Sequence, residues 1–147
     1  MNDAKAVVEA FCRGLGIKSG ADAEGVYSFS VDVGEFAVHD LSEEGHLLLT
    51  ADLGQVPPGN AAGLFRLMLE AQHNFRETAG AVFSIDDERG RFTLSRVISC
   101  ATLDEDVLFR EVERFVNLFE VWVHIIRSYE GHNDSTETPM DLYGIKV

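Results

Sequence analysis

The pattern of apolar and polar positions between residues 27 and 53 predicts three strands. In the run 27–33, large apolar residues alternate with Ser28, Ser30 and Asp32, which is the period of a half-buried strand. Two further runs, 35–41 and 46–53, are separated by turn residues. Together these runs predict a three-stranded antiparallel meander.

A second pair of strand-like runs, 81–85 and 92–98, lies on either side of a short charged turn. The turn ends at Gly90, a residue suited to a left-handed turn position. These runs predict a hairpin.

Three segments have the i, i+3, i+4, i+7 spacing of a helix with one buried side. The first begins after Asn2 and Asp3 and ends near residue 15, and the second follows Asn60. The third and longest covers roughly 104–128, and the stretch 102–105 before it has the Ser/Thr-x-x-Glu form of a capping box. Each segment carries an apolar stripe: Ala4, Val7, Val8, Phe11 and Leu15; then Leu64, Phe65, Met68, Ala71 and Phe75; then Leu108, Val112, Phe115, Phe119, Trp122 and Ile126.

The order α-β-β-β-α-β-β-α predicts an α+β fold with a twisted antiparallel sheet and three helices. The 147 residues are enough for one domain with a substantial core. We expect this domain to span 1–130. It is followed by the segment 131–147, a polar tail whose end, Met140–Val147, turns apolar again.

The net charge is −13, and it is unevenly distributed. Residues 1–60 hold ten acids and three bases, residues 61–103 hold five of each, and residues 104–147 hold ten acids and four bases. An acidic surface repels nucleic-acid phosphates and anionic lipid headgroups, so neither partner is expected. The neutral middle could lie in a self-interface, although solvated faces that merely differ in composition are an equal alternative.

The N-terminus lacks the form of a signal peptide, and the run 115–126 is too short and too polar to span a bilayer. We therefore expect a cytoplasmic protein without membrane insertion.

Little in the sequence indicates catalysis. Cys12 and Cys100 are isolated, and no phosphate-binding glycine loop, nucleophile elbow or dinucleotide fingerprint is present. His39 and His46 lie on successive predicted strands, but no third metal ligand accompanies them. The acidic clusters fall at turns or at a helix start, where carboxylates are solvated. No enzyme activity, metal or cofactor is expected.

Several stretches, taken in order, resemble the type III secretion chaperones of the Tir-chaperone (CesT-like) family. They are AFCRGLGI, HLLLTADLGQVPP, LFRLMLEAQHNF, TAGAVFSIDDERGRFTLSRVI and LDEDVLFREVERFVNLFEVW. The resemblance covers roughly residues 3–128, and the tail lies outside it.

The resemblance implies a homodimer that binds the N-terminal segment of a secreted effector in extended form and keeps it partly unfolded for export. Carried onto this chain, it gives two sets of candidate residues. The effector groove would use Val8, Phe11, Leu15, Phe29 and Val31, and the dimer contact would use Leu64, Leu67, Met68 and Phe83. On this interpretation, Phe11→Asp abolishes effector binding and leaves the fold intact.

Two other classes of function stay open. One is a dimeric regulatory or scaffold domain of the same fold that binds a folded partner. The other is a small enzyme that uses His39 and His46 with a nearby acid.

Overall fold

The computed structural model describes residues 3–17 and 20–132, and it has the predicted α+β element order. The elements are α1 (Ala4–Gly14), β1 (Val26–Val31), β2 (Gly34–Leu41), β3 (His46–Gln55), α2 (Ala62–Gln72), β4 (Val82–Asp86), β5 (Arg91–Ser99) and α3 (Glu105–His132). Short 3-10 turns follow β2, α2 and β5 (η1, Ser42–Glu44; η2, His73–Phe75; η3, Cys100–Thr102). Apart from its first two residues, the predicted tail 131–147 lies outside the described residues.

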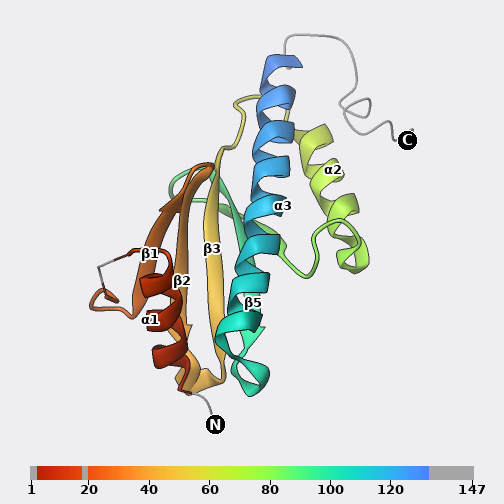
Figure 1. Ribbon diagram of the computed structural model, residues 1–147. Helices are drawn as coiled ribbons and strands as arrows, with labels where there is room; N and C mark the ends of the chain where they lie inside the picture. The colour runs from red at the N-terminus through yellow and green to blue at the C-terminus, as the bar shows by residue number, and fades with distance from the viewer. Residues whose placement is uncertain (1–2, 18–19, 133–147) are drawn as a thin grey trace.

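The five strands form one antiparallel sheet in the order β1-β2-β3-β5-β4 (Figure 1). The predicted meander (β1–β3) and the predicted hairpin (β4–β5) are both present. They are joined along β3 and β5, which pair from His46 opposite Ser99 to Gln55 opposite Arg91. A register shift between Asp52 and Gly54 bends this central pair.

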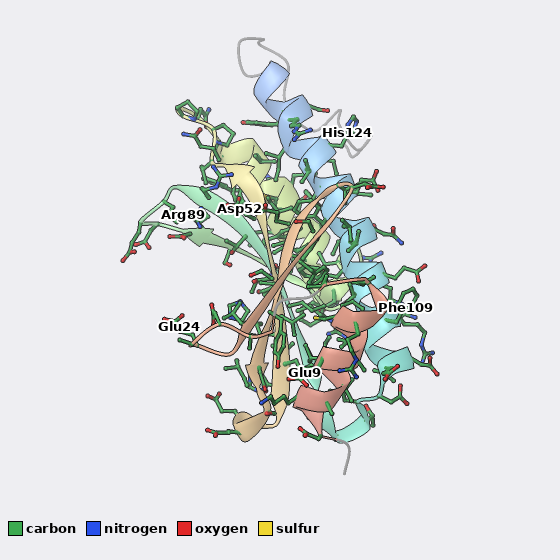
Figure 2. All side chains as sticks on the ribbon, turned by 60° about the vertical axis from the view of Figure 1, so that its left-hand side comes forward. Glu9, Glu24, Asp52, Arg89, Phe109 and His124 are labelled. Carbon is green, nitrogen blue, oxygen red and sulfur yellow. The ribbon has the colours of Figure 1, made fainter. Side chains whose placement is uncertain are left out.

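All three helices contact the same face of the sheet, and aromatic pairs mark each contact. Phe11 of α1 packs on Phe29, and Phe65 of α2 packs on Phe92. Trp122 of α3 packs on Phe83. The strand residues in these pairs point to one side in the sheet register. Among the described residues, the opposite face carries no helix, and we call it the helix-free face. Figure 2 shows the β4–β5 hairpin with Arg89 projecting away from the helices.

The long helix α3 buries its entire predicted stripe, from Leu108 to Ile126. Its N-cap, however, is not the predicted one. The Asp104 carboxylate accepts a hydrogen bond from the Val107 amide at 2.8 Å, whereas Thr102 closes the 3-10 turn η3. The capping-box prediction is wrong because the chain does not turn into the helix until two residues later.

The second helix begins near the predicted cap, since the Asn60 side chain accepts a hydrogen bond from the Ala62 amide at 3.2 Å. It ends earlier than its apolar stripe indicates. Asn74 has a φ of 55°, a left-handed conformation that cannot continue an α-helix. Phe75, predicted to lie on the stripe, is therefore outside the helix and half exposed.

Candidate protein-binding surfaces

Exposed apolar side chains concentrate beside α2 and β4. Of the eight large hydrophobic side chains that are exposed in the described part of the chain, four come from α2, the turn after it and β4. They are Leu69 (66% exposed), Phe75 (51%), Val82 (37%) and Ile85 (48%). In the strand register Val82 points to the helix-free face, opposite to Ile85, so we call Leu69, Phe75 and Ile85 the α2–β4 surface. Apolar surface of this kind on a folded domain marks a contact site for another protein.

The residues predicted for the dimer contact lie in this region but mostly beneath it. Leu64, Leu67 and Met68 are buried in the core. Phe83 is half-buried, with its ring 4.7 Å from that of Trp122. The assignment of these four residues to a dimer contact stays a prediction. Leu69 lies off the predicted apolar stripe of α2, and an apolar residue on a second side of a helix is the signal that could have indicated this surface.

The residues predicted for the effector groove divide in a similar way. Val8, Phe11 and Phe29 are buried, because α1 lies on β1 and covers them. Leu15, at the end of α1, is 41% exposed, and Val31 is partly buried. In this structure the groove prediction therefore depends on Leu15 and Val31, since the other three side chains offer almost no surface to a partner.

Strand β1 is an edge of the sheet. Among the described residues it pairs with β2 alone, so one row of its backbone N–H and C=O groups faces outward. An open depression of about 570 Å³ lies next to this edge on the helix-free face. Ile17 borders it on one side and Arg89 on another, and Ser28 and Ser30 of β1 line it. We call the β1 edge, with Leu15, Ile17 and Val31, the β1-edge surface.

A charged cluster lies at the far side of the depression, on the helix-free face. Arg91 donates from Nε to the Asp52 carboxylate at 2.6 Å, and Arg89 approaches the same oxygen at 3.6 Å. The Gly54 amide donates to the other oxygen at 2.8 Å. Burial by itself would raise the pKa of Asp52, but the hydrogen bonds from Arg91 and Gly54 and the two positive charges outweigh it and lower the pKa. Asp52 is therefore ionised at neutral pH, and its ion pairs with Arg89 and Arg91 connect the β4–β5 hairpin to β3.

The histidines and cysteines considered for catalysis make contacts that belong to the fold and form no catalytic arrangement with one another. His39 Nε2 lies 2.9 Å from the Thr50 hydroxyl on the neighbouring strand. His46 is opposite Leu41 in the register, so the two histidines are diagonal neighbours and not a direct pair. Burial raises the pKa of both Cys12 and Cys100, which reduces the thiolate fraction that a nucleophile needs. In residues 3–17 and 20–132, no three His, Cys, Asp or Glu side chains are grouped so as to hold a metal ion.

Comparison with known proteins settles the family. The model of the Tir chaperone protein (CesT) family matches residues 7–123, which is most of the chain. The chain belongs to the Tir chaperone protein (CesT) family. A protein of Chlamydia pneumoniae, CPj0713/CpB0740, is 28% identical to this chaperone over 120 residues, covering 80% of this chain and 91% of its own length.

Solved structures with a similar fold include chaperones in complex with effectors. The chain is similar to one in the ExsC–ExsE complex, with a TM-score of 0.70, 22% identity and coverage of 85% of this chain and 97% of the other. It is similar to one in the HopA1–SchA chaperone–effector complex, with a TM-score of 0.66, 19% identity and coverage of 82% and 92%. A chain in the ExoU–SpcU complex from the type III secretion system of Pseudomonas aeruginosa gives a TM-score of 0.64, 23% identity and coverage of 79% and 94%. At these identities the likeness shows the fold.

The family match confirms the sequence-based resemblance, and the fold is the predicted α+β arrangement. Within the described residues, no helix combines the length and the apolarity needed to cross a membrane.

Proposed function

We propose that this chaperone binds the N-terminal segment of a secreted effector in extended form and keeps that segment partly unfolded and soluble for export. The observation that carries the proposal is the open edge of β1 beside exposed apolar side chains. A protein of similar fold is found in the HopA1–SchA chaperone–effector complex, which supports an effector as the partner.

The β1-edge surface has the two components that an extended segment needs. Beyond Val26, whose backbone N–H and C=O are bonded to Asp22, the outward-facing backbone groups of β1 can pair with an added strand. Such pairing orients a peptide without reading its sequence. Leu15 and Ile17 offer apolar contacts beside the edge. Affinity comes from burying apolar side chains of the segment, and the surrounding acidic surface keeps the complex soluble.

The same proposal includes a homodimer through the α2–β4 surface. Leu69, Phe75 and Ile85 are exposed in one chain, and a second copy is the occupant that best fits the charge distribution. The segment 61–103 holds equal numbers of acids and bases, whereas both other segments are strongly acidic. Two copies that meet elsewhere would bring like charges together, and contact here avoids that repulsion.

The effector-binding part is tested by capture and footprinting. The tagged chaperone is purified from its native cell, and retained proteins are identified by mass spectrometry after limited proteolysis of the complex. Protection of about 50–100 residues as one extended stretch supports the proposal, because a wrapped segment becomes ordered only on binding. A compact folded footprint would instead identify a scaffold that binds a folded partner.

A pair of substitutions then tests the surface. Leu15→Asp is expected to weaken binding of the captured segment at least tenfold without lowering the melting temperature. The matched control is Val121→Asp, at a similarly exposed position of α3. Equal affinity for both variants would contradict the role of the β1-edge surface.

The dimer is tested separately by sedimentation equilibrium, where the wild-type mass should be twice that of one chain. Leu69→Asp is expected to shift the protein toward monomer, and Val121→Asp should leave the mass unchanged. A wild-type monomer at micromolar concentration would contradict this part.

A further inference from the structure

The connector between α2 and β4, residues 73–81, has an unfavourable backbone conformation. Asn74, Phe75 and Ala79 have φ values of 55°, 56° and 47°, and they are the three residues other than glycine with positive φ in the described part of the chain. Side chains at such φ values clash with their own backbone, so a free loop would avoid them. Contacts from the rest of the domain must therefore hold the connector in place.

Two hydrogen bonds tie the middle of the connector and the strand after it to the end of α2. The Glu77 amide donates to the Ala71 carbonyl at 3.1 Å. The Phe83 amide donates to the Gln72 side-chain oxygen at 2.7 Å. These bonds close the loop but do not contact Gly80, where the chain passes over β5.

Arg96 makes that contact. From β5, its Nη1 donates to the Gly80 carbonyl at 3.4 Å, and its Nε donates to Glu111 of α3 at 3.3 Å. Gly80 has a φ of 87°, and a Cβ there would overlap the Arg96 guanidinium. The Arg96 guanidinium thus lies against the connector at Gly80 and is held there by the carboxylate of Glu111, whose side chain is 19% exposed.

Thr78, in the connector, is buried beside a small cavity. Thr78 is fully buried, and its hydroxyl has no hydrogen-bond partner within the described residues. A small cavity beside it is lined by Ala81, Arg96, Glu111 and Phe115. A buried hydroxyl without a partner is unfavourable, which is a second sign that this segment is held by its surroundings.

We propose that Arg96 and Glu111 are positioning residues for self-association. They hold the connector in the conformation that presents Phe75 together with Leu69 and Ile85, so that the α2–β4 surface is formed before the second copy arrives. This inference rests on the proposed dimer. Preformed surfaces bind more tightly because less conformational freedom is lost on association.

The chain supplies a matched control for Arg96. Arg91 also lies on β5 and also pairs with a carboxylate, but its partner is Asp52 on the helix-free face. We expect Arg96→Met to raise the dimer dissociation constant at least tenfold and Arg91→Met to change it by less than twofold, both measured by sedimentation equilibrium. Glu111→Gln keeps the helix and removes the anchoring charge, and it should raise the constant by a smaller factor in the same direction.

Hydrogen exchange and a double-mutant cycle separate positioning from general destabilisation. In Arg96→Met, the amides of Glu77, Ala81 and Phe83 should exchange faster, while those of β1 and β2 keep the wild-type rate. Phe75→Ala should weaken the wild-type dimer strongly but add little to Arg96→Met, because both changes remove the same contact.

The outcomes are distinct. A wild-type protein that is dimeric, with Arg96→Met and Arg91→Met giving equal dissociation constants, overturns the inference and leaves the proposed dimer intact. Additive effects of Phe75→Ala and Arg96→Met also overturn it. A monomeric wild type overturns the inference together with the dimer.

Discussion

The ring of Phe11 in α1 meets the ring of Phe29 in β1 edge to face, with the two centroids 5.7 Å apart. Both side chains are buried, so this contact attaches α1 to the sheet. Phe11→Ala is expected to lower the free energy of unfolding by about 3–5 kcal/mol, measured by urea denaturation. Leu15→Ala, at the exposed end of the same helix, should cost less than about 0.5 kcal/mol.

This contact changes the expectation for Phe11→Asp. A carboxylate at this buried position would be removed from water without a partner, which is strongly unfavourable. The variant is therefore expected to unfold rather than lose binding alone, and a folded Phe11→Asp protein would contradict the burial described here.

Gly34 opens β2 directly beneath α3. A Cβ at this position would lie 2.8 Å from the ring of Phe119, closer than non-bonded carbon atoms approach. Gly34→Ala should therefore lower stability by about 1–3 kcal/mol, because a packed core resists added volume. Thermal unfolding measures the loss. Gly14→Ala, at the end of α1, is the control, because a Cβ there would meet no neighbouring side chain or other segment within 4 Å. The melting temperature of this variant should match or exceed that of the wild type.

The N-terminus of α3 is capped by Asp104. Asp104→Ala removes the acceptor for the Val107 amide and should cost about 1 kcal/mol of stability. Asp104→Asn retains an acceptor and should cost much less. Thr102→Ala should be close to neutral in the same denaturation experiment, whereas a loss as large as that of Asp104→Ala would favour the capping box that the sequence indicates.

Asp52 links stability to pH. Because its pKa is lowered in the folded protein, the ionised form stabilises the fold above the unfolded-state pKa, and that contribution disappears as the pH falls through the folded-state value. Asp52→Asn should be less stable than the wild type by about 0.5–1 kcal/mol at pH 7, in line with a partly exposed ion pair. The difference should shrink as the pH falls below about 4. Urea denaturation at pH 7, 5 and 3 measures it, and a constant difference would show that the charge is not responsible.

The order and type of the elements could be predicted from the sequence because each has its own period. Strands β1 to β5 alternate in steps of two, and the stripe from Leu108 to Ile126 follows the helical period. Element ends were less predictable. Helix α2 ends at Gln72 although Phe75 continues its apolar stripe, because the backbone leaves the helical conformation at His73 and Asn74.

The candidate sites show what the apolar pattern of the sequence could not predict. Val8, Phe11 and Phe29 were predicted to contact a partner. Their apolar character indicates that they are buried, but it does not say by which element. In this chain α1 and the sheet bury these side chains against each other. Leu69 and Ile85 are equally apolar and are exposed, because no element within residues 3–17 and 20–132 covers them. Apolarity is a local property of a residue, whereas the identity of the surface that buries it depends on distant parts of the chain.

The sequence by itself thus determined the α+β element order, which follows from the short-range spacing of apolar residues. It also determined the acidic ends and the neutral middle, which follow from the positions of the charged residues. Only the tertiary structure decided that β3 pairs with β5, that β1 is left as an open edge and that Arg96 reaches the connector at Gly80. These features join residues far apart in the chain, and they arise from how the helices and strands pack together, which local periodicity does not encode.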